Sequence, residues 1–223
     1  MELTTADVAR LFRVSAGTVA RWVQEENLPA SEVDSQYRFN REELLEWATI
    51  HKLAIPAAIL QSASAAQAPE PSVADALAYG GVAYEVCGAD RGESLQAALE
   101  GLPLPDDADR EALLGLFLAR ERMGTTAVGD GVAIPHPRCP LVLGLPQSAV
   151  RLCFLAQPHD FGAPDGKPVD TLFLMACRTV HEHLKLLARL ATALRSEAFR
   201  QVLARRAGPA EIIAALRREE TAP

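Results

Sequence analysis

Residues 120–136 carry the most specific pattern in this sequence of 223 residues, RERMGTTAVGDGVAIPH. The stretch ends on a short apolar segment at 132–134, which predicts a strand, and then on His136 between Pro135 and Pro137. Proline fixes its own φ and disfavours the helical conformation in the residue before it. We therefore expect an extended backbone on both sides of His136, which presents the imidazole stiffly to a partner.

Around this stretch, residues 77–219 alternate strand-like and helical patterns. The expected strands cover residues 82–86, 132–134, 150–155 and 171–177. The expected helices cover residues 94–100, 110–122, 181–194, 197–204 and 209–216. Strands and helices mixed at these lengths predict an α/β sandwich built on a central sheet.

A histidine in such a position suits the transfer of phosphoryl groups. Neutral imidazole is nucleophilic near pH 7, its unperturbed pKa is about 6.5, and one ring nitrogen can be held while the other attacks phosphorus. A phosphorylated ring gains negative charge, and the planar fork of a guanidinium matches phosphate oxygens. By contrast, the sequence has no GxGxxG or GxxxxGK loop, so nothing indicates a nucleotide-binding protein.

Residues 120–136, with the segments 81–86 and 182–188, resemble the IIA component of the fructose-mannitol and nitrogen-regulatory branch of the phosphoenolpyruvate-dependent sugar phosphotransferase system. The resemblance covers residues 77–219 and implies a mixed β-sheet sandwiched by helices. It implies that His136 accepts the phosphoryl group, that Arg120 steadies the phosphate and that His183 is a second active-site histidine. The implied donor is the small histidine-phosphorylated carrier protein, and no cofactor is implied.

This chain departs from the family pattern directly after the acceptor position. The family usually has glycine there, whereas Pro137 lacks the backbone N–H that would help to bind phosphate, and Arg138 is a candidate to compensate. Three alternatives stay open: a structural role for His136, a helix-capping role for Arg120, and Arg122 as the phosphate ligand. His181 and His183 do not face one another on a helix, so we expect no metal site.

Residues 1–53 form a separate block with its own start and stop signals. Thr4 or Thr5 can cap a first helix, and Ser15 can cap a second that carries Val19 and Trp22 on one side. Residues 30–39 predict a turn and a short hairpin, and Asn40 begins a third helix. Two short helices joined by a tight turn and followed by a hairpin predict a small winged helix-turn-helix domain.

This block closely resembles the excisionase and MerR-type winged helix-turn-helix family. The resemblance implies DNA contacts from the second helix and the wing, and the candidate contact residues are Arg13, Ser15, Thr18, Arg21 and Arg38. Such heads often pair on palindromic sites, so a homodimer is consistent with this prediction.

Charge argues against a simple DNA-binding surface on this block. Residues 1–50 hold five arginines and no lysine against nine acidic residues, a net charge of −4, and the whole chain has a net charge of −7. Non-specific binding to nucleic acid gains its free energy when Lys and Arg neutralise phosphates. The alternative is a non-phosphorylated IIA-like interaction module whose head docks onto another protein.

The remaining sequence features concern the linker and the cellular location of the protein. Nine alanines, three prolines and three serines among the 23 residues 54–76 predict a linker, of which residues 57–66 could continue as helix. The longest apolar stretch, residues 172–177, is far shorter than a membrane span, and the N-terminus lacks a signal-peptide pattern. We expect a cytoplasmic protein without membrane attachment, whose four dispersed cysteines are buried thiols.

Overall fold

The computed structural model describes residues 3–33, 36–39, 41–53, 70–106, 108–137, 145 and 147–221. The chain divides into two compact units, Met1–Ala68 and Pro69–Pro223, which we call the first and the second unit. Each unit has its own β-sheet and its own buried core.

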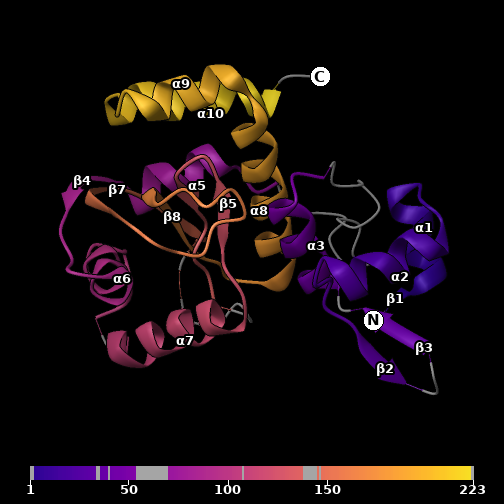
Figure 1. The fold of residues 1–223 in the computed structure, drawn as a ribbon. Helices are drawn as coiled ribbons and strands as arrows, with labels where there is room; N and C mark the ends of the chain where they lie inside the picture. The colour runs from indigo at the N-terminus through magenta and orange to yellow at the C-terminus, as the bar shows by residue number, and fades with distance from the viewer. Residues whose placement is uncertain are drawn as a thin grey trace. The chain divides into compact units, whose positions relative to one another are not determined.

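The second unit is built on a five-stranded mixed sheet (Figure 1). In spatial order its strands are β4 (Val82–Val86), β7 (Ala149–His159), β8 (Val169–Ala176), β6 (Val132–Ala133) and β5 (Ala127–Gly129). The pairs β4–β7 and β6–β8 are parallel, whereas β7–β8 and β5–β6 are antiparallel. A mixed sheet covered by helices confirms the predicted fold class.

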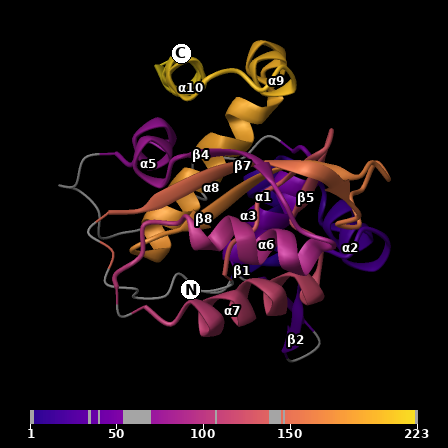
Figure 2. The same ribbon diagram turned by 90° about the vertical axis from the view of Figure 1, so that its left-hand side faces the viewer.

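Helices cover both faces of this sheet. They are α5 (Val73–Gly80), α6 (Arg91–Glu100), α7 (Arg110–Met123), α8 (Val180–Arg195), α9 (Glu197–Ala204) and α10 (Pro209–Thr221). Figure 2 shows α6 and α7 on one side of the sheet. On the other side α5 packs against β7 and is joined by α8 and α10.

The alternation of side chains along β7 explains this two-sided arrangement. Cys153 and Leu155 belong to the core cluster that α6 and α7 cover. Leu152 and Phe154 point to the opposite face, because successive side chains of a strand alternate, and both are fully buried. A strand that is apolar on both faces requires a helical layer on each side.

Within the described residues, the first unit contains three helices and a small antiparallel sheet. Its elements are β1 (Leu3–Thr4), α1 (Thr5–Phe12), α2 (Ala16–Glu25), β2 (Ser31–Val33), β3 (Gln36–Phe39) and α3 (Arg41–Ile50). The rings of Trp22 and Trp47 lie 5.0 Å apart and join α2 to α3. The expected helix caps are Thr4, which forms a capping box with Asp7, and Ser15. Asn40, expected to cap the third helix, lies outside the described residues.

Two elements of the second unit differ from the sequence-based expectations. Helix α5 begins at Val73, inside the segment 54–76 whose composition predicted a linker, and its residues Val73 and Leu77 are fully buried. Composition misses this helix because alanine is common in both linkers and helices, and burial is decided by tertiary packing. Residues 54–69 lie outside the described part of the chain. Strand β5 was not expected either, because three residues are too few for a periodic pattern.

Candidate functional site

The segment that carries His136 is held in place from both sides. The backbone N–H of Ile134 donates to the carbonyl of Thr126 at 3.0 Å, and the N–H of Met175 donates to the carbonyl of Pro135 at 3.0 Å. The first bond joins the segment to Thr126, the residue directly before β5, and the second bond joins it to β8. His136 therefore follows directly from an anchored stretch of backbone, and its side chain is 3% exposed rather than presented as the flanking prolines predicted.

One nitrogen of the His136 ring is already engaged. Its Nδ1 lies 2.6 Å from the carbonyl oxygen of Ile134. A carbonyl oxygen only accepts hydrogen bonds, so this contact requires the proton of the neutral ring to be on Nδ1. The lone pair is then on Nε2, which makes Nε2 the nucleophilic nitrogen.

His183 is the second histidine that the fold brings to this place. It lies in the first turn of α8, which Thr179 caps by accepting a hydrogen bond from the N–H of Glu182. The rings of His136 and His183 have centroids 5.0 Å apart, with an interplanar angle of 52°. The two histidines thus form a pair, although they come from distant parts of the chain.

A polar contact from the start of β7 supports this first turn of α8. The hydroxyl of Ser148 donates to the carboxylate of Glu182 at 2.5 Å and accepts from the backbone N–H of Arg178 at 3.0 Å. Ser148 is 8% exposed, so these bonds replace hydrogen bonds to water. Sequence patterns gave no sign of this residue, because a single serine before a strand is common.

Arg120 lies in the last turn of α7. Its guanidinium donates from Nη1 to the carbonyl of Gly124 at 2.9 Å, the carbonyl of the helix C-cap. The capping contact, which was the alternative role for Arg120, is therefore present, and a guanidinium with five N–H donors can combine it with a second role. Arg122 is exposed at the same helix end, and Arg138 lies outside the described residues.

Burial excludes one nearby thiol from nucleophilic chemistry. Cys177 follows β8 and is 3% exposed, and burial raises the pKa of its thiol to about 12. Only the thiolate is an effective nucleophile, so Cys177 is inert near neutral pH. Among the groups discussed at this end of the sheet, the histidine pair has the suitable nucleophile.

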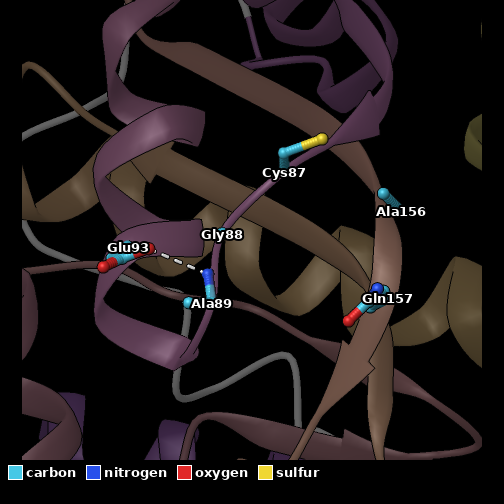
Figure 3. A pocket seen from close by; sticks show the side chains of 6 residues that line it. All are labelled: Cys87, Gly88, Ala89, Glu93, Ala156 and Gln157. Carbon is cyan, nitrogen blue, oxygen red and sulfur yellow. Dashed lines mark hydrogen bonds between the residues drawn. The ribbon is translucent and has the colours of Figure 1, made fainter.

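A pocket of about 410 Å³ lies elsewhere in the second unit (Figure 3). Its lining residues are Cys87, Gly88, Ala89, Glu93, Ala156 and Gln157. It sits where β4 ends, and β4 runs in the opposite direction to β6, so it lies at the other end of the sheet from His136. The exposed Cys87 corrects the expectation that all four cysteines are buried.

The first unit places its candidate DNA-contact residues around α2. Arg13 occupies the left-handed conformation between α1 and α2, with φ of 56°, and both Arg13 and Arg21 are exposed. Ser15 caps α2 by accepting from the N–H of Thr18 at 3.0 Å, and the two hydroxyls are 2.9 Å apart. Ser15 and Thr18 therefore have a structural role at the helix start. Arg38 is on β3, in the wing.

A membrane-crossing helix is absent from the described part of the chain, where each helix is too short or too polar for that purpose.

Comparison with known proteins identifies both units. A family model described as phosphoenolpyruvate-dependent sugar phosphotransferase system, EIIA 2, matches residues 105–219. A model described as a helix-turn-helix domain matches residues 2–49. The first match lies wholly within the second unit and the other wholly within the first unit.

Individual relatives agree with the first of these matches. A nitrogen regulatory protein of Bradyrhizobium diazoefficiens is 42% identical over 94 residues, which are 40% of this chain and 58% of that protein. One from Pseudomonas aeruginosa is 38% identical over 88 residues, covering 39% of this chain and 55% of that protein. The chain thus spans little more than half the length of these curated relatives.

A solved structure extends the likeness to the fold. The nitrogen regulatory protein IIA-Ntr from Neisseria meningitidis superposes with a TM-score of 0.56 and 27% identity, over 65% of this chain and 98% of that one. The EIIA match covers more than half of the present sequence. The chain therefore belongs to the EIIA type 2 family of the phosphoenolpyruvate-dependent sugar phosphotransferase system, and its N-terminal unit is a helix-turn-helix domain.

Proposed function

We propose that the second unit accepts a phosphoryl group on Nε2 of His136. The observation that carries this proposal is the state of the His136 ring, whose Nδ1 is held by the Ile134 carbonyl while a second histidine ring lies 5.0 Å away. A held Nδ1 leaves Nε2 as the nitrogen with the lone pair. Membership of the EIIA family supports the same assignment.

The transfer itself needs only a nucleophile and charge stabilisation. The lone pair of Nε2 forms a bond to phosphorus as the bond from phosphorus to the donor's histidine nitrogen breaks, and that nitrogen leaves with the electron pair. His136 keeps its proton on Nδ1, so, while the attached phosphoryl group carries the added negative charge, the imidazole ring becomes positively charged. The Ile134 carbonyl, 2.6 Å from Nδ1, stabilises that charge.

Three groups would stabilise the incoming phosphoryl oxygens: the backbone N–H groups at the start of α8, the imidazole of His183 and the guanidinium of Arg120. His183 lies in the first turn of α8, where the helix dipole and backbone N–H groups favour an anion. Its imidazole can itself donate a hydrogen bond. Arg120, in the last turn of α7, supplies the guanidinium of the proposed site.

The proposed phosphoryl donor is the histidine-phosphorylated carrier protein of the phosphotransferase system. Incubation of the full chain with phosphoenolpyruvate and the general components of that system should give acid-labile phosphate on this protein. The His136→Ala variant should take up none, whereas the matched His159→Ala variant should be labelled like the wild type. His159 is a suitable control because its ring donates to the carbonyl of Gly88, at the other end of β7. Label that persists in His136→Ala would refute the proposal.

We propose further that the first unit binds DNA through α2 and the β2–β3 wing. The supporting observations are the helix-turn-helix match and the exposure of Arg13 and Arg21 on either side of the start of α2. Arg38 extends the contact set to the wing, and Ser15 and Thr18 complete it as residues of the first turn. A change in the charge of His136 on phosphorylation would then regulate what the first unit binds, and the active form is proposed to be a homodimer.

The competing proposal is protein docking through the same unit, which the net charge of −4 over residues 1–50 favours. Salt dependence distinguishes the two. DNA affinity should fall steeply with salt concentration, and Arg21→Ala should reduce the slope by about 1. Arg10→Ala is the matched control, because Arg10 lies on α1, outside the contact set, and pairs with Asp7. An affinity that is insensitive to salt, or equal effects of both variants, would favour docking.

A further inference from the structure

A buried carboxylate next to the proposed phosphate ligand has no role in the site as described so far. Glu121 follows Arg120 in the last turn of α7, and its side chain is only 1% exposed. Its Oε1 accepts a hydrogen bond from the backbone N–H of Thr126 at 2.9 Å and another from the hydroxyl of Thr126. Its Oε2 lies 3.7 Å from the guanidinium of Arg91.

The residue that Glu121 holds is directly connected to the acceptor histidine. Thr126 uses its carbonyl to accept from the N–H of Ile134 at 3.0 Å. Ile134 in turn uses its carbonyl to accept from Nδ1 of His136 at 2.6 Å. Three consecutive hydrogen-bonded steps therefore lead from the Glu121 carboxylate to the histidine ring.

The rest of the loop between α7 and β5 is anchored in the same region. The hydroxyl of Thr125 donates to the carbonyl of Phe161 at 2.5 Å and accepts from the N–H of Ala127 at 2.9 Å. Thr126 itself is 2% exposed, so its N–H and hydroxyl would lack partners without Glu121. A buried donor without a partner is costly, so the loop would move to satisfy them.

We propose that Glu121 is a positioning residue for His136. Acting through Thr126 and Ile134, it fixes the carbonyl that keeps the proton on Nδ1, and thereby presents Nε2 for phosphoryl transfer. This inference deepens the proposed phosphoryl-acceptor function and rests on it, because the orientation of the ring matters for transfer only if His136 is the acceptor.

Three variants of the full chain test this role. Glu121→Ala removes both acceptors from Thr126, and Glu121→Gln keeps one oxygen of the same shape and reach. Glu111→Ala is the matched control, because Glu111 is an exposed glutamate in the first turn of the same helix. Each variant is compared by its rate of phosphorylation and by the ¹⁵N resonances of the unphosphorylated His136 ring.

We expect Glu121→Ala to slow phosphorylation by about 10- to 100-fold, the usual effect of losing a group that orients a functional histidine. Its His136 ¹⁵N resonances should move from those of a single Nδ1-protonated ring toward those of two exchanging tautomers. Glu121→Gln should restore most of the rate and the single-tautomer resonances, and Glu111→Ala should match the wild type. A purely structural role would lower stability in Glu121→Ala and leave the tautomer of the folded protein unchanged.

The two readouts separate this inference from the function on which it rests. If Glu121→Ala leaves both the rate and the ¹⁵N resonances unchanged, the positioning role is wrong. If the resonances shift but the wild-type protein takes up no phosphate, Glu121 positions the ring and the proposed acceptor function is wrong. Should Glu121→Ala fail to fold, Thr126→Val serves instead. Thr126→Val removes only the hydroxyl bond to Glu121, so it should give a smaller change of the same kind, and an unchanged tautomer in Thr126→Val would then overturn the proposal.

Discussion

At the level of single residues, the histidine pair depends on contacts made by its neighbours. Ile134 holds one nitrogen of His136, and Ser148 supports the turn of α8 from which His183 projects. Neither residue would be chosen as functional from its type alone. Residue-level predictions therefore concern both the histidines and the groups that hold them.

Replacement of His183 by alanine should slow phosphorylation of His136 by about 100-fold, because one donor to the developing negative charge is lost. The initial rate of phosphate uptake measures this effect. His181→Ala is the matched control, since residues two apart on α8 point in different directions. Equal rates for the two variants would show that His183 does not act on the phosphoryl group.

Two buried serines of the second unit should respond in opposite ways to substitution by alanine. Ser148→Ala removes the partner of the Arg178 N–H and of Glu182, so we expect the free energy of unfolding to fall by about 1–3 kcal/mol. The hydroxyl of Ser94 is fully buried and has no hydrogen-bond partner within the described residues. Ser94→Ala should therefore be neutral or stabilising. Urea unfolding of both variants tests the contrast, which a similar loss for the two would contradict.

At the level of elements, helix capping and close packing decide which serines, threonines and glycines contribute to stability. Thr4 caps α1, Ser15 caps α2 and Ser72 caps α5, each with its side-chain oxygen accepting from a backbone N–H three residues ahead. Where a helix and a strand approach very closely, only glycine fits, because a Cβ would collide with the neighbouring backbone. Both features can be tested by substitutions within one element.

Thr4→Ala should destabilise α1 by about 1 kcal/mol, the usual cost of a lost N-cap. Hydrogen bonds from the Thr4 hydroxyl and backbone N–H lower the pKa of Asp7. A carboxyl whose pKa is lower in the folded state stabilises the fold above its unfolded pKa of about 3.9, and this contribution disappears as the pH falls through the folded pKa. The difference between Thr4→Ala and the wild type should therefore shrink at acidic pH.

Hydrogen exchange of the α1 amides at neutral and acidic pH measures this capping effect. Thr5→Ala is the control, because Thr5 is already inside the helix and was the other candidate cap in the sequence. A larger loss of protection in Thr5→Ala than in Thr4→Ala would show that Thr4 is not the residue that caps α1.

Two helical glycines of the second unit make a second contrast. A Cβ at Gly80, the last residue of α5, would collide with the backbone of Val150 in β7, so Gly80→Ala should cost about 1–3 kcal/mol. At Gly115 in α7 nothing lies within 4 Å, and Gly115→Ala should gain about 0.5–1 kcal/mol. Thermal unfolding of the two variants should give shifts of opposite sign, and shifts of the same sign would contradict the packing described here.

At the level of the whole second unit, its two ends are joined by one carboxylate. Glu220 in α10 accepts from the N–H of Val73 at 2.5 Å and from the hydroxyl of Ser72 at 2.8 Å, at the start of α5. Arg189 of α8 lies 3.8 Å from the same carboxylate. The last helix therefore supplies the acceptor for the first one.

Glu220→Ala should lower the free energy of unfolding of the second unit by about 1–3 kcal/mol, because the N–H of Val73 loses a charged acceptor. Chemical unfolding of the full chain, followed by hydrogen exchange at α5, locates the effect. Glu100→Ala removes an exposed carboxylate at the end of α6 and should change little. If α5 keeps its protection in Glu220→Ala, the contact of Glu220 with the start of α5 does not contribute to the stability of the second unit.

The sequence by itself determined the type and order of most elements, because helical and strand periods are local properties. The expected helices at 110–122 and 197–204 lie on α7 and α9, and the expected strand at 82–86 coincides with β4. The prolines around His136 likewise predicted a presented imidazole, whereas the side chain of His136 is only 3% exposed. Motif spacing was enough for the family and the fold class, which the comparisons and the structure confirm.

Only the tertiary structure decided which residues meet. The pairing of His136 with His183 depends on how α8 meets the segment that follows β6. The hydrogen bonds of Ile134 with His136 and of Glu121 with Thr126 span only two and five residues, but they depend on loop geometry that no periodic pattern predicts. The burial of α5 was decided in the same way, against a composition that predicted a linker. The physical reason is that the histidine pair and the packing of α5 join residues far apart in the chain, through packing and strand register that no local pattern encodes.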